Sequence, residues 1–297
     1  MAEGGGAAVI VNWNGAELLP GCLAALEPDA SRVDIVVVDN ASADGSADLV
    51  ARDHPRIELV RNARNDGWAR GNNIGLRRAL EKGARWVALF NTDTRPAPGW
   101  PDAVEAAFAR DDRLAAVGFT LFEGRGEDVD RAFEAAVAAP AAPPRPVDFV
   151  TGAAMVLRSA ALRDVGLIDE VYFMYCDDMD LCERMRRAGW RLGEVAFPVR
   201  HLSEGSARRV PRRTGYLSMR NSLRFYLRYR GPAFALRHMG GVLKIAVGAT
   251  RLDDPNDIRH RYRPGMAGLN FSLWLAAVVW NVAHLPTTLW GRPRITV

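Results

Sequence analysis

Three aspartates, Asp177, Asp178 and Asp180, stand within four residues, directly before a segment with helical periodicity. Like charges this close repel one another, so a chain keeps them mainly where a cation, a proton transfer or a hydroxyl donor requires them. Helix capping is the alternative, because an aspartate at a helix start accepts backbone N–H bonds and complements the macrodipole. A cap needs only one acid, and the cluster is therefore a candidate for a catalytic base.

Polar residues also follow three of the predicted strands, at the point where each strand ends. In an open parallel sheet the ligand lies beyond the carboxyl ends of the strands. A carboxylate there can accept the imide N–H of a pyrimidine, and Asn and Ser neighbours can complete the readout of uracil or thymine. Turn formation explains each residue alone, but the coincidence across strands predicts a nucleotide site. Its candidates are Asn12, Asn14, Asp39, Asn40, Ser42, Asn91 and Thr92.

The segment 65–73, which begins Asn-Asp-Gly67-Trp68, precedes a helix-like stretch and brings backbone N–H groups, Arg70 and Asn72 toward the expected pyrophosphate. The chain has neither G-x-G-x-x-G after its first strand nor a P-loop, which excludes the nicotinamide and flavin fingerprint. Asn91-Thr92-Asp93 has the spacing of a D-x-D motif whose first acid is an amide. Asp93 is therefore a candidate ligand for Mg²⁺ or Mn²⁺ bridging phosphates.

The elements that must position these residues alternate between β-rich and helix-like runs, which predicts an α/β fold with a doubly wound, mostly parallel sheet. Between Glu123 and Pro146, the Ala, Pro and charged residues predict a mobile loop over the active face. The sheet returns over 147–199, and basic, aromatic helices follow. The expected strands of the first half are 8–12, 35–39, 57–61, 86–91 and 115–120, and the expected helices are 16–26, 46–52, 71–82 and 100–110.

Charge is divided along the 297 residues: residues 200–297 hold 17 Lys and Arg against 4 Asp and Glu, whereas residues 1–199 hold 22 against 31. The division predicts an acidic catalytic body and a basic tail that meets an anionic surface, either phospholipid or nucleic acid. Three cysteines without C-x-x-C spacing, and no signal peptide, predict a cytoplasmic location.

Two features of the tail favour different surfaces. Arg220, Arg224, Arg228 and Arg230 have near-helical spacing and fit a nucleic-acid binder. Trp274, Trp280 and Trp290 beside basic helices fit a membrane interface better. The apolar stretches Val242–Ala249 and Phe271–Leu285 are shorter than the roughly 18–20 residues of a membrane span, so we expect peripheral binding.

Six motifs, taken in order, give the chain a resemblance to the inverting glycosyltransferases of family 2, which have the GT-A fold. Within that family it resembles the rhamnosyltransferase-like branch that builds bacterial surface polysaccharides. The match runs from about Ala8 to about Arg230. The motifs are Val-Val-Val-Asp39-Asn40-Ala-Ser42, Asn65-x-Gly67-Trp68-Ala-x-Gly71-Asn72-Asn73, Phe90-Asn91-Thr-Asp93-Thr94, Gly152-Ala-Ala-Met155, Asp169-Glu-x-Tyr-Phe-Met-Tyr-x-Asp177-Asp178-x-Asp180, and His201-x-x-x-Gly205-Ser206.

The resemblance implies a role for each matched position. Asp39 reads the pyrimidine, with Gly67, Arg70 and Asn72 facing the donor diphosphate. Asp93 and His201 hold the divalent metal, Mn²⁺ or Mg²⁺. Gly152, Trp68 and Asp180 line the sugar and acceptor site. Asp178 is the base, but Asp177 stands where relatives often have Glu, and the choice between the two neighbours stays open.

The implied reaction transfers a sugar, L-rhamnose from dTDP-rhamnose in the branch resembled, to a saccharide or polyprenyl-linked acceptor. The alternative donor is a UDP-hexose or UDP-HexNAc, and a nucleotidyltransferase is a rival enzyme class. We expect a nucleotide-sugar half over 1–120, an acceptor and catalytic half over 121–210, and a basic helical extension over 211–297. That extension meets the inner face of the cytoplasmic membrane or a second subunit in a homodimer; nucleic acid is not expected as a partner.

Overall fold

A computed structural model describes residues 5–139, 143–203, 210–247 and 267–291 of the chain. The chain divides into two compact units: unit 1 is Met1–Glu170, Asp178–Ser206 and Ile295–Val297, and unit 2 is Val171–Asp177 and Ala207–Arg294. Unit 1 contains the sheet, and unit 2 is helical. The division into donor, acceptor and C-terminal regions at 120 and 210 stays a prediction.

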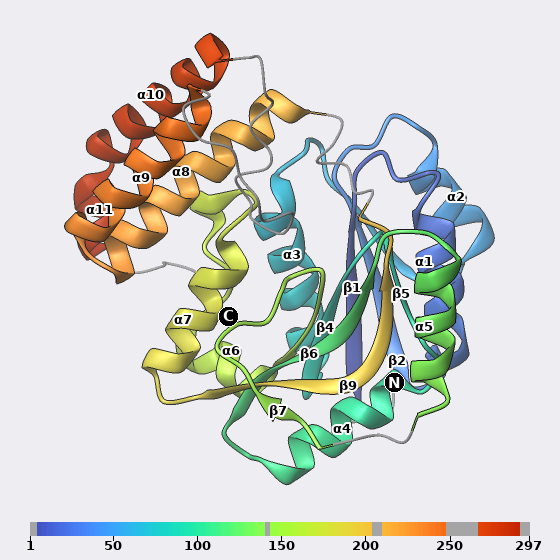
Figure 1. Ribbon diagram of the computed structural model, residues 1–297. Helices are drawn as coiled ribbons and strands as arrows, with labels where there is room; N and C mark the ends of the chain where they lie inside the picture. The colour runs from blue at the N-terminus through green and yellow to red at the C-terminus, as the bar shows by residue number, and fades with distance from the viewer. Residues whose placement is uncertain (1–4, 140–142, 204–209, 248–266, 292–297) are drawn as a thin grey trace. The chain divides into compact units, whose positions relative to one another are not determined.

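The sheet of unit 1 has nine strands in the order β3-β2-β1-β4-β8-β6-β9-β5, with β7 paired to β9 (Figure 1). Strands β3, β2, β1, β4, β6 and β9 run in one direction, and β8, β5 and β7 oppose them. The strands are β1 Gly6–Asn12, β2 Val33–Asp39, β3 Glu58–Arg61, β4 Trp86–Asn91, β5 Thr94–Pro96, β6 Leu114–Glu123, β7 Arg145–Pro146, β8 Ala154–Arg158 and β9 Arg191–His201.

Helices cover both faces of this sheet because its central strands are apolar on both sides. In β1, Val9 points into the core shared with α3, and Ile10 points into the core shared with α1 and α4. Figure 1 shows α3 on one side of the sheet and α1 and α2 on the other. Buried runs of this kind are typical of doubly wound parallel sheets. The helices are α1 Leu19–Leu26, α2 Ser46–Asp53, α3 Gly67–Glu81, α4 Trp100–Arg110, α5 Glu127–Val137, α6 Ser159–Val165 and α7 Asp177–Arg187.

The predicted alternation of strands and helices is confirmed through the first half of the chain, with one correction after it. The segment 123–146, predicted as a loop, contains helix α5. No residue of α5 is buried. Val129, Phe133 and Val137 follow one another at spacings of four, which is a helical period. The Ala, Pro and charged composition of the whole segment 123–146 hid this short signal.

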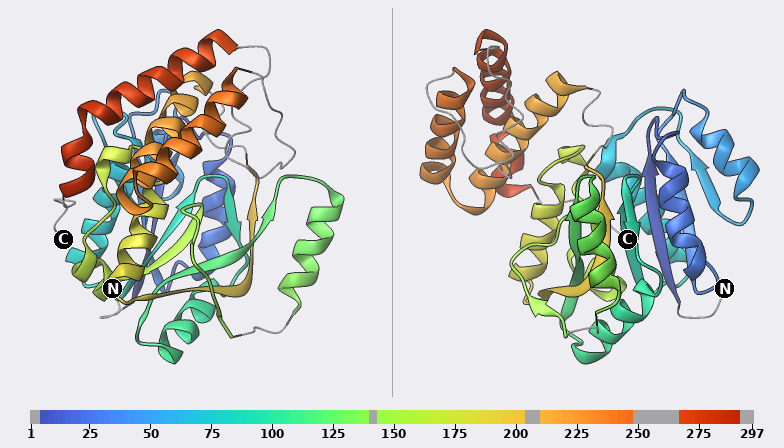
Figure 2. Two further views of the ribbon diagram at one scale, coloured as in Figure 1. Left: turned by 60° about the vertical axis from the view of Figure 1, so that its left-hand side comes forward. Right: turned by 45° about the vertical axis from the view of Figure 1, so that its right-hand side comes forward.

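Unit 2 contains α8 Pro211–Tyr229, α9 Pro232–Ala246, α10 Ala267–Ala283 and α11 Leu285–Trp290. Helices α8, α9 and α10 lie side by side (Figure 2) and share small apolar cores around Met219 and Leu223. Within the described part of the chain, no helix is both long enough and apolar enough to cross a bilayer.

Candidate functional site

The strands that share one direction each end in a polar residue. These final residues are Asn12, Asp39, Arg61, Asn91, Glu123 and His201. Because the carboxyl ends of parallel strands meet at one edge of a sheet, this edge gathers amides, acids and an imidazole. Glu123 is the member that the sequence did not predict, since the expected strand stopped at Thr120.

Asp39 is fixed by a network that joins several of the predicted nucleotide residues. The Asn12 amide donates to Asp39 Oδ1 at 2.7 Å and also to Ser42 Oγ at 3.1 Å. Ser42 donates its hydroxyl to Asp39 Oδ1 at 2.6 Å and its backbone N–H to Oδ2 at 3.0 Å. Asn14 closes the network, because its backbone N–H donates to Ser42 Oγ at 2.8 Å. The carboxylate is only 3% exposed, and within the described residues Oδ2 keeps capacity for a further donor.

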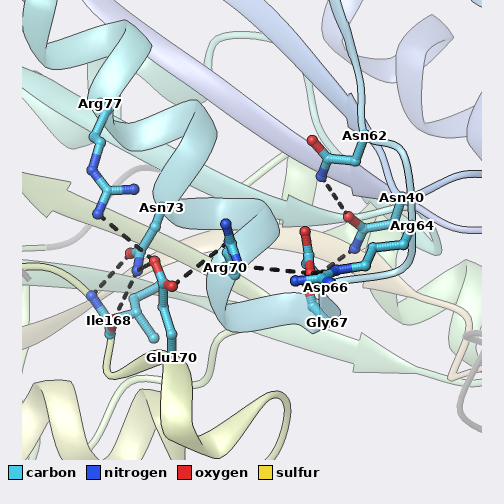
Figure 3. A network of polar contacts seen from close by, with 10 residues as sticks. All are labelled: Asn40, Asn62, Arg64, Asp66, Gly67, Arg70, Asn73, Arg77, Ile168 and Glu170. Atoms are coloured by element: carbon cyan, nitrogen blue, oxygen red, sulfur yellow. Dashed lines mark hydrogen bonds and ion pairs between the residues drawn. The ribbon is translucent and has the colours of Figure 1, made fainter.

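Asn40, also predicted at the nucleotide, supports the start of α3 instead. Its amide donates to the carbonyl of Gly67 at 3.0 Å, and Asn62 donates to its Oδ1 at 2.8 Å (Figure 3). Gly67 has φ +85°, a conformation that favours glycine, so this turn aims the first N–H groups of α3. Asn40 therefore fixes the backbone at the start of α3, in the segment that was predicted to face the diphosphate.

Arg70 lies between two acids on the exposed side of α3. Its guanidinium is 3.8 Å from Asp66 Oδ1 and 3.8 Å from Glu170 Oε2, and its side chain is 47% exposed (Figure 3). Both ion pairs are long, and exposed pairs contribute little stability. Asn72 differs: it is buried and its amide donates to the carbonyl of Trp68 at 2.9 Å, on its own helix. Of the two, Arg70 is the side chain available to a diphosphate.

Trp68, Asn91, Gly152 and Asp178 meet at the end of β4. The Trp68 indole N–H donates to Asn91 Oδ1 at 2.9 Å, and the Gly152 N–H donates to Asp178 Oδ2 at 3.0 Å. A Cβ on Gly152 would lie 2.7 Å from the Trp68 ring, so only glycine fits between the two side chains. Thr92, next along the chain, is half-buried.

The three clustered aspartates occupy different environments. Asp180 is fully buried and accepts from Arg184 Nε at 2.8 Å, and Arg184 also donates to the carbonyl of Leu167 at 2.7 Å. This pairing ties α7 to the segment before it, and it uses the carboxylate that was predicted at the sugar and acceptor site. Asp177 is 3% exposed, whereas Asp178 is half-buried. Burial thus favours Asp178 as the acid that a substrate can reach.

Asp93 and His201 come together because β5 pairs with β9 directly beside them. His201 Nε2 lies 3.6 Å from Asp93 Oδ2, and His201 Nδ1 lies 2.9 Å from Glu123 Oε1. Burial lowers the pKa of His201, but hydrogen bonds and charge from Asp93 and Glu123 outweigh it and raise the pKa to about 9. The hydrogen bond from His201 likewise holds the pKa of Glu123 below its usual range.

Asp93 and His201 offer two ligands for a metal ion, which is fewer than a complete coordination shell needs. Within the described ranges, no group of three or more His, Cys, Asp or Glu side chains is arranged to hold one. Asp93 Oδ2 and His201 Nε2 are close enough to be neighbouring ligands of one cation. Mg²⁺ is commonly held by one or two carboxylates with substrate phosphates completing its shell, so the pair fits a cation that arrives with a diphosphate.

Unit 2 holds the segment that leads into the aspartates in an unusual conformation. Phe173, Tyr175 and Cys176 have φ of 65°, 71° and 61°, which is uncommon for residues other than glycine. The Asn221 amide of α8 donates to the carbonyls of Tyr172, Met174 and Tyr175 at 2.8, 2.7 and 3.0 Å. Arg220 adds a bond to the carbonyl of Val171 at 2.6 Å.

Arg220 and Arg224, whose spacing is that of a basic helical face, are buried in the structure. They are 9% and 3% exposed. Arg220 lies over the Trp280 ring at 4.6 Å, and Arg224 donates to Thr288 Oγ1 at 2.8 Å. Buried in this way, neither guanidinium is available to a phosphate backbone.

Comparison with known proteins agrees with this geometry. Residues 7–166 match the family model "Glycosyl transferase family 2". The N-acetylglucosaminyl-diphospho-decaprenol L-rhamnosyltransferase of Mycobacterium tuberculosis is 27% identical over 191 residues, which cover 53% of this chain and 62% of the relative. The match thus spans less than two thirds of that relative's length.

Two solved structures show the same fold. The crystal structure of GalNAc-T7 with UDP, GalNAc and Mn²⁺ superposes with a TM-score of 0.60 at 14% identity, covering 96% of this chain and 58% of the other. The mannosyltransferase PcManGT of Pyrobaculum calidifontis, in complex with GDP-Man and Mn²⁺, gives 0.54 at 19% identity, covering 93% and 86%. The chain therefore belongs to glycosyl transferase family 2 and has the GT-A fold.

Proposed function

We propose that this enzyme transfers a sugar from a nucleoside diphosphate to a hydroxyl of a lipid-linked saccharide, inverting the anomeric carbon, and that the sugar is L-rhamnose from dTDP-rhamnose. The observation that carries the proposal is the placement of Asp178 against Gly152 and Trp68, at the strand end that also carries Asn91. A half-buried carboxylate beside a glycine, where no side chain blocks the approach, is suited to take a proton from an acceptor hydroxyl.

Donor binding is assigned to the strand ends on the Asp39 side. Asp39 is held by Asn12 and Ser42, so its free acceptor capacity has a fixed direction toward a pyrimidine N–H. Arg70 would leave its two long ion pairs for the diphosphate, which offers shorter, charge-assisted hydrogen bonds. Uracil and thymine share the imide N–H, and the geometry of Asp39 accepts both.

The chemical step is a single displacement. The acceptor oxygen bonds to the anomeric carbon while the bond from that carbon to the diphosphate oxygen breaks, and the nucleoside diphosphate leaves with the electron pair. Asp178 takes the hydroxyl proton. No second nucleophile is needed, unlike the two-carboxylate chemistry of retaining hydrolases.

Asp93 and His201 would hold Mn²⁺ or Mg²⁺, and this agrees with the Mn²⁺ bound in both structural neighbours. When bound, the cation supplies positive charge that stabilises the leaving diphosphate. The role of Glu123 is to orient His201, because its bond to Nδ1 leaves Nε2 directed at Asp93.

Rhamnose and a lipid-linked acceptor are supported by the mycobacterial relative, whose name specifies L-rhamnose and a decaprenol-linked acceptor. The alternative, a UDP-hexose or UDP-HexNAc donor, is supported by the UDP and GalNAc in the GalNAc-T7 structure. A lipid-linked acceptor would place the reaction at the inner face of the cytoplasmic membrane.

Thermal-shift measurements with dTDP, UDP and GDP, each with and without Mn²⁺, test the donor, since a ligand stabilises the folded state by mass action. We expect the largest shift with dTDP and Mn²⁺. A larger shift with UDP would select the alternative donor. Product analysis separates the rival enzyme class: a glycosyltransferase releases nucleoside diphosphate, whereas release of pyrophosphate would identify a nucleotidyltransferase.

A further inference from the structure

The last two helices of unit 2 expose apolar side chains along one line of α10 and its continuation in α11. Phe271, Leu275, Val279 and Val282 follow one another at spacings of four, four and three, and are 44%, 47%, 59% and 67% exposed. Trp290, at the end of α11, is 76% exposed. We call these five residues the α10–α11 apolar face. A contiguous face of this kind marks an interaction surface far more often than a bare solvent surface.

The opposite side of the same helices is buried and carries polar as well as apolar residues. Asn281 is 1% exposed and its amide donates to the carbonyl of Arg220 at 2.9 Å. Thr288 is fully buried and accepts from Arg224 at 2.8 Å. Amides, a hydroxyl and guanidinium groups therefore lie in the contact with α8, beside the small apolar core that includes Ala277. Helix α10 thus exposes aliphatic side chains on its outer face in addition to the apolar side chains that its inner contact buries.

The sequence around this face indicates its partner. Residues 267–291 contain no Asp, Glu, Lys or Arg. Arginines flank them on both sides, with Arg259, Arg261 and Arg263 before and Arg292 and Arg294 after. An uncharged apolar face with cationic flanks complements the acyl and headgroup layers of an anionic bilayer. Two copies of this chain would bring like charges together at both ends, which disfavours a homodimer through this face.

We propose that the α10–α11 apolar face docks into the interfacial layer of an anionic phospholipid bilayer. The face lies in the plane of the interface, since no described helix can span. Docking would hold the enzyme where a lipid-linked acceptor is presented. That consequence rests on the proposed function, while docking itself needs neither donor nor acceptor.

Vesicle co-sedimentation of the full-length chain, without any sugar substrate, tests the proposal. Vesicles are phosphatidylcholine alone or with about one third phosphatidylglycerol. The test variant is Leu275→Glu with Val279→Glu, which puts two charges on the apolar face. The control is Val137→Glu on α5, because Val137 is 47% exposed, as Leu275 is. Both variants replace exposed side chains, so neither is expected to lose the fold.

We expect wild type and Val137→Glu to bind the anionic vesicles and to be released by high salt. The double variant should bind at least tenfold more weakly, because it removes apolar surface from the contact and adds two negative charges that an anionic surface repels. Equal binding by the double variant, or no binding by wild type, would overturn the proposal. A wild-type dimer in light scattering that the double variant converts to monomer, without vesicle binding, would identify a second copy as the occupant and also overturn it.

The proposed function has a separate readout in the same samples. Thermal shift with dTDP and Mn²⁺ should be equal in wild type and the double variant, since both changes lie outside the donor residues. Loss of the nucleotide response in wild type, with vesicle binding intact, would count against the function and leave docking standing. A nucleotide response in wild type without vesicle binding would count against docking alone.

Discussion

The side-chain amide of Asn221 lies 3.0 Å from the carbonyl oxygen of Tyr175, a residue with φ of 71°. The same amide donates to two more carbonyls of the segment that leads into α7. A non-glycine residue in this conformation costs roughly 1–3 kcal/mol and persists only where its surroundings hold it. Helix α8 thus supplies the hydrogen bonds that keep this segment, which ends at Asp177, in its conformation.

We therefore predict that Asn221→Ala lowers kcat at least tenfold while the Kd for nucleoside diphosphate stays within about twofold, because a displacement of only about 1 Å at a catalytic group can cost 10²-fold in rate. Steady-state kinetics and calorimetry measure the two quantities. Asn281→Ala is the matched control, since it removes a bond to the α8 backbone and none to the segment before α7. Equal losses of kcat in both variants would mean that Asn221 acts only through the stability of unit 2.

Substitutions within the cluster of three aspartates should differ in whether they lower the catalytic rate or the stability. Asp178→Asn should lower kcat by about 10²–10⁴, the usual cost of losing a general base, with nucleotide affinity retained. Asp180→Asn should instead lower the melting temperature, because it weakens a buried pair with Arg184. More than about a tenth of wild-type kcat in Asp178→Asn would transfer the assignment to Asp177.

The metal prediction concerns Asp93 and Glu123. Asp93→Ala should weaken nucleoside diphosphate binding in Mn²⁺ buffer, and EDTA should produce the same loss in wild type. Glu123→Gln should lower Mn²⁺ affinity by about 10–100-fold, the usual effect of removing a partner that orients a ligating His. Calorimetry with Mn²⁺ and dTDP measures both. Affinity for dTDP that is unchanged by EDTA would show that arginine and backbone donors bind the diphosphate without a cation.

His201 gives a pH dependence of stability in EDTA. Its pKa of about 9 in the folded protein lies above the ordinary value of 6.5. The contribution to stability is therefore complete below about pH 6.5 and is lost as the pH rises through 9, with a size of roughly 3 kcal/mol. Denaturant unfolding of wild type should show this decline, and His201→Gln should show a smaller slope over the same range. Parallel curves for the two proteins would contradict the prediction.

The sequence predicted the strand ends well because the signal there is local. Buried apolar runs that stop at Asn12, Asp39 or Asn91 predict both the strand and its polar end. Glu123 was missed because the expected strand stopped at Thr120, whereas β6 continues through the apolar, half-buried Leu121 and Phe122. Asn221 was missed for a different reason: its acceptors lie 46–49 residues earlier in the chain, and only tertiary structure brings them within reach.

Contacts between residues far apart in the sequence also explain why Asp180, Arg220 and Arg224 have other surroundings than the sequence suggested. Asp180 and Arg184 have the spacing of any i,i+4 helix pair, and the carbonyls that Arg184 also contacts belong to another segment. Arg220 and Arg224 look like a solvated basic face until Trp280 and Thr288 are placed against them. Charge patterns in a sequence show which groups are present, and burial decides what they do.

The order of strands in the sheet has a consequence for how the active protein forms during synthesis. Asp93 and Glu123 emerge early, but His201 ends the last strand to be made, 78 residues after Glu123. Pairing of β9 with β6 and β5 closes long loops, which is slow relative to local helix formation. A nascent chain can therefore complete the Asp39 network, whose members lie within the first 46 residues, long before it can complete the cation pair. Catalytic activity should therefore appear in one late step, when β9 pairs, after the residues that recognise the nucleoside have already folded.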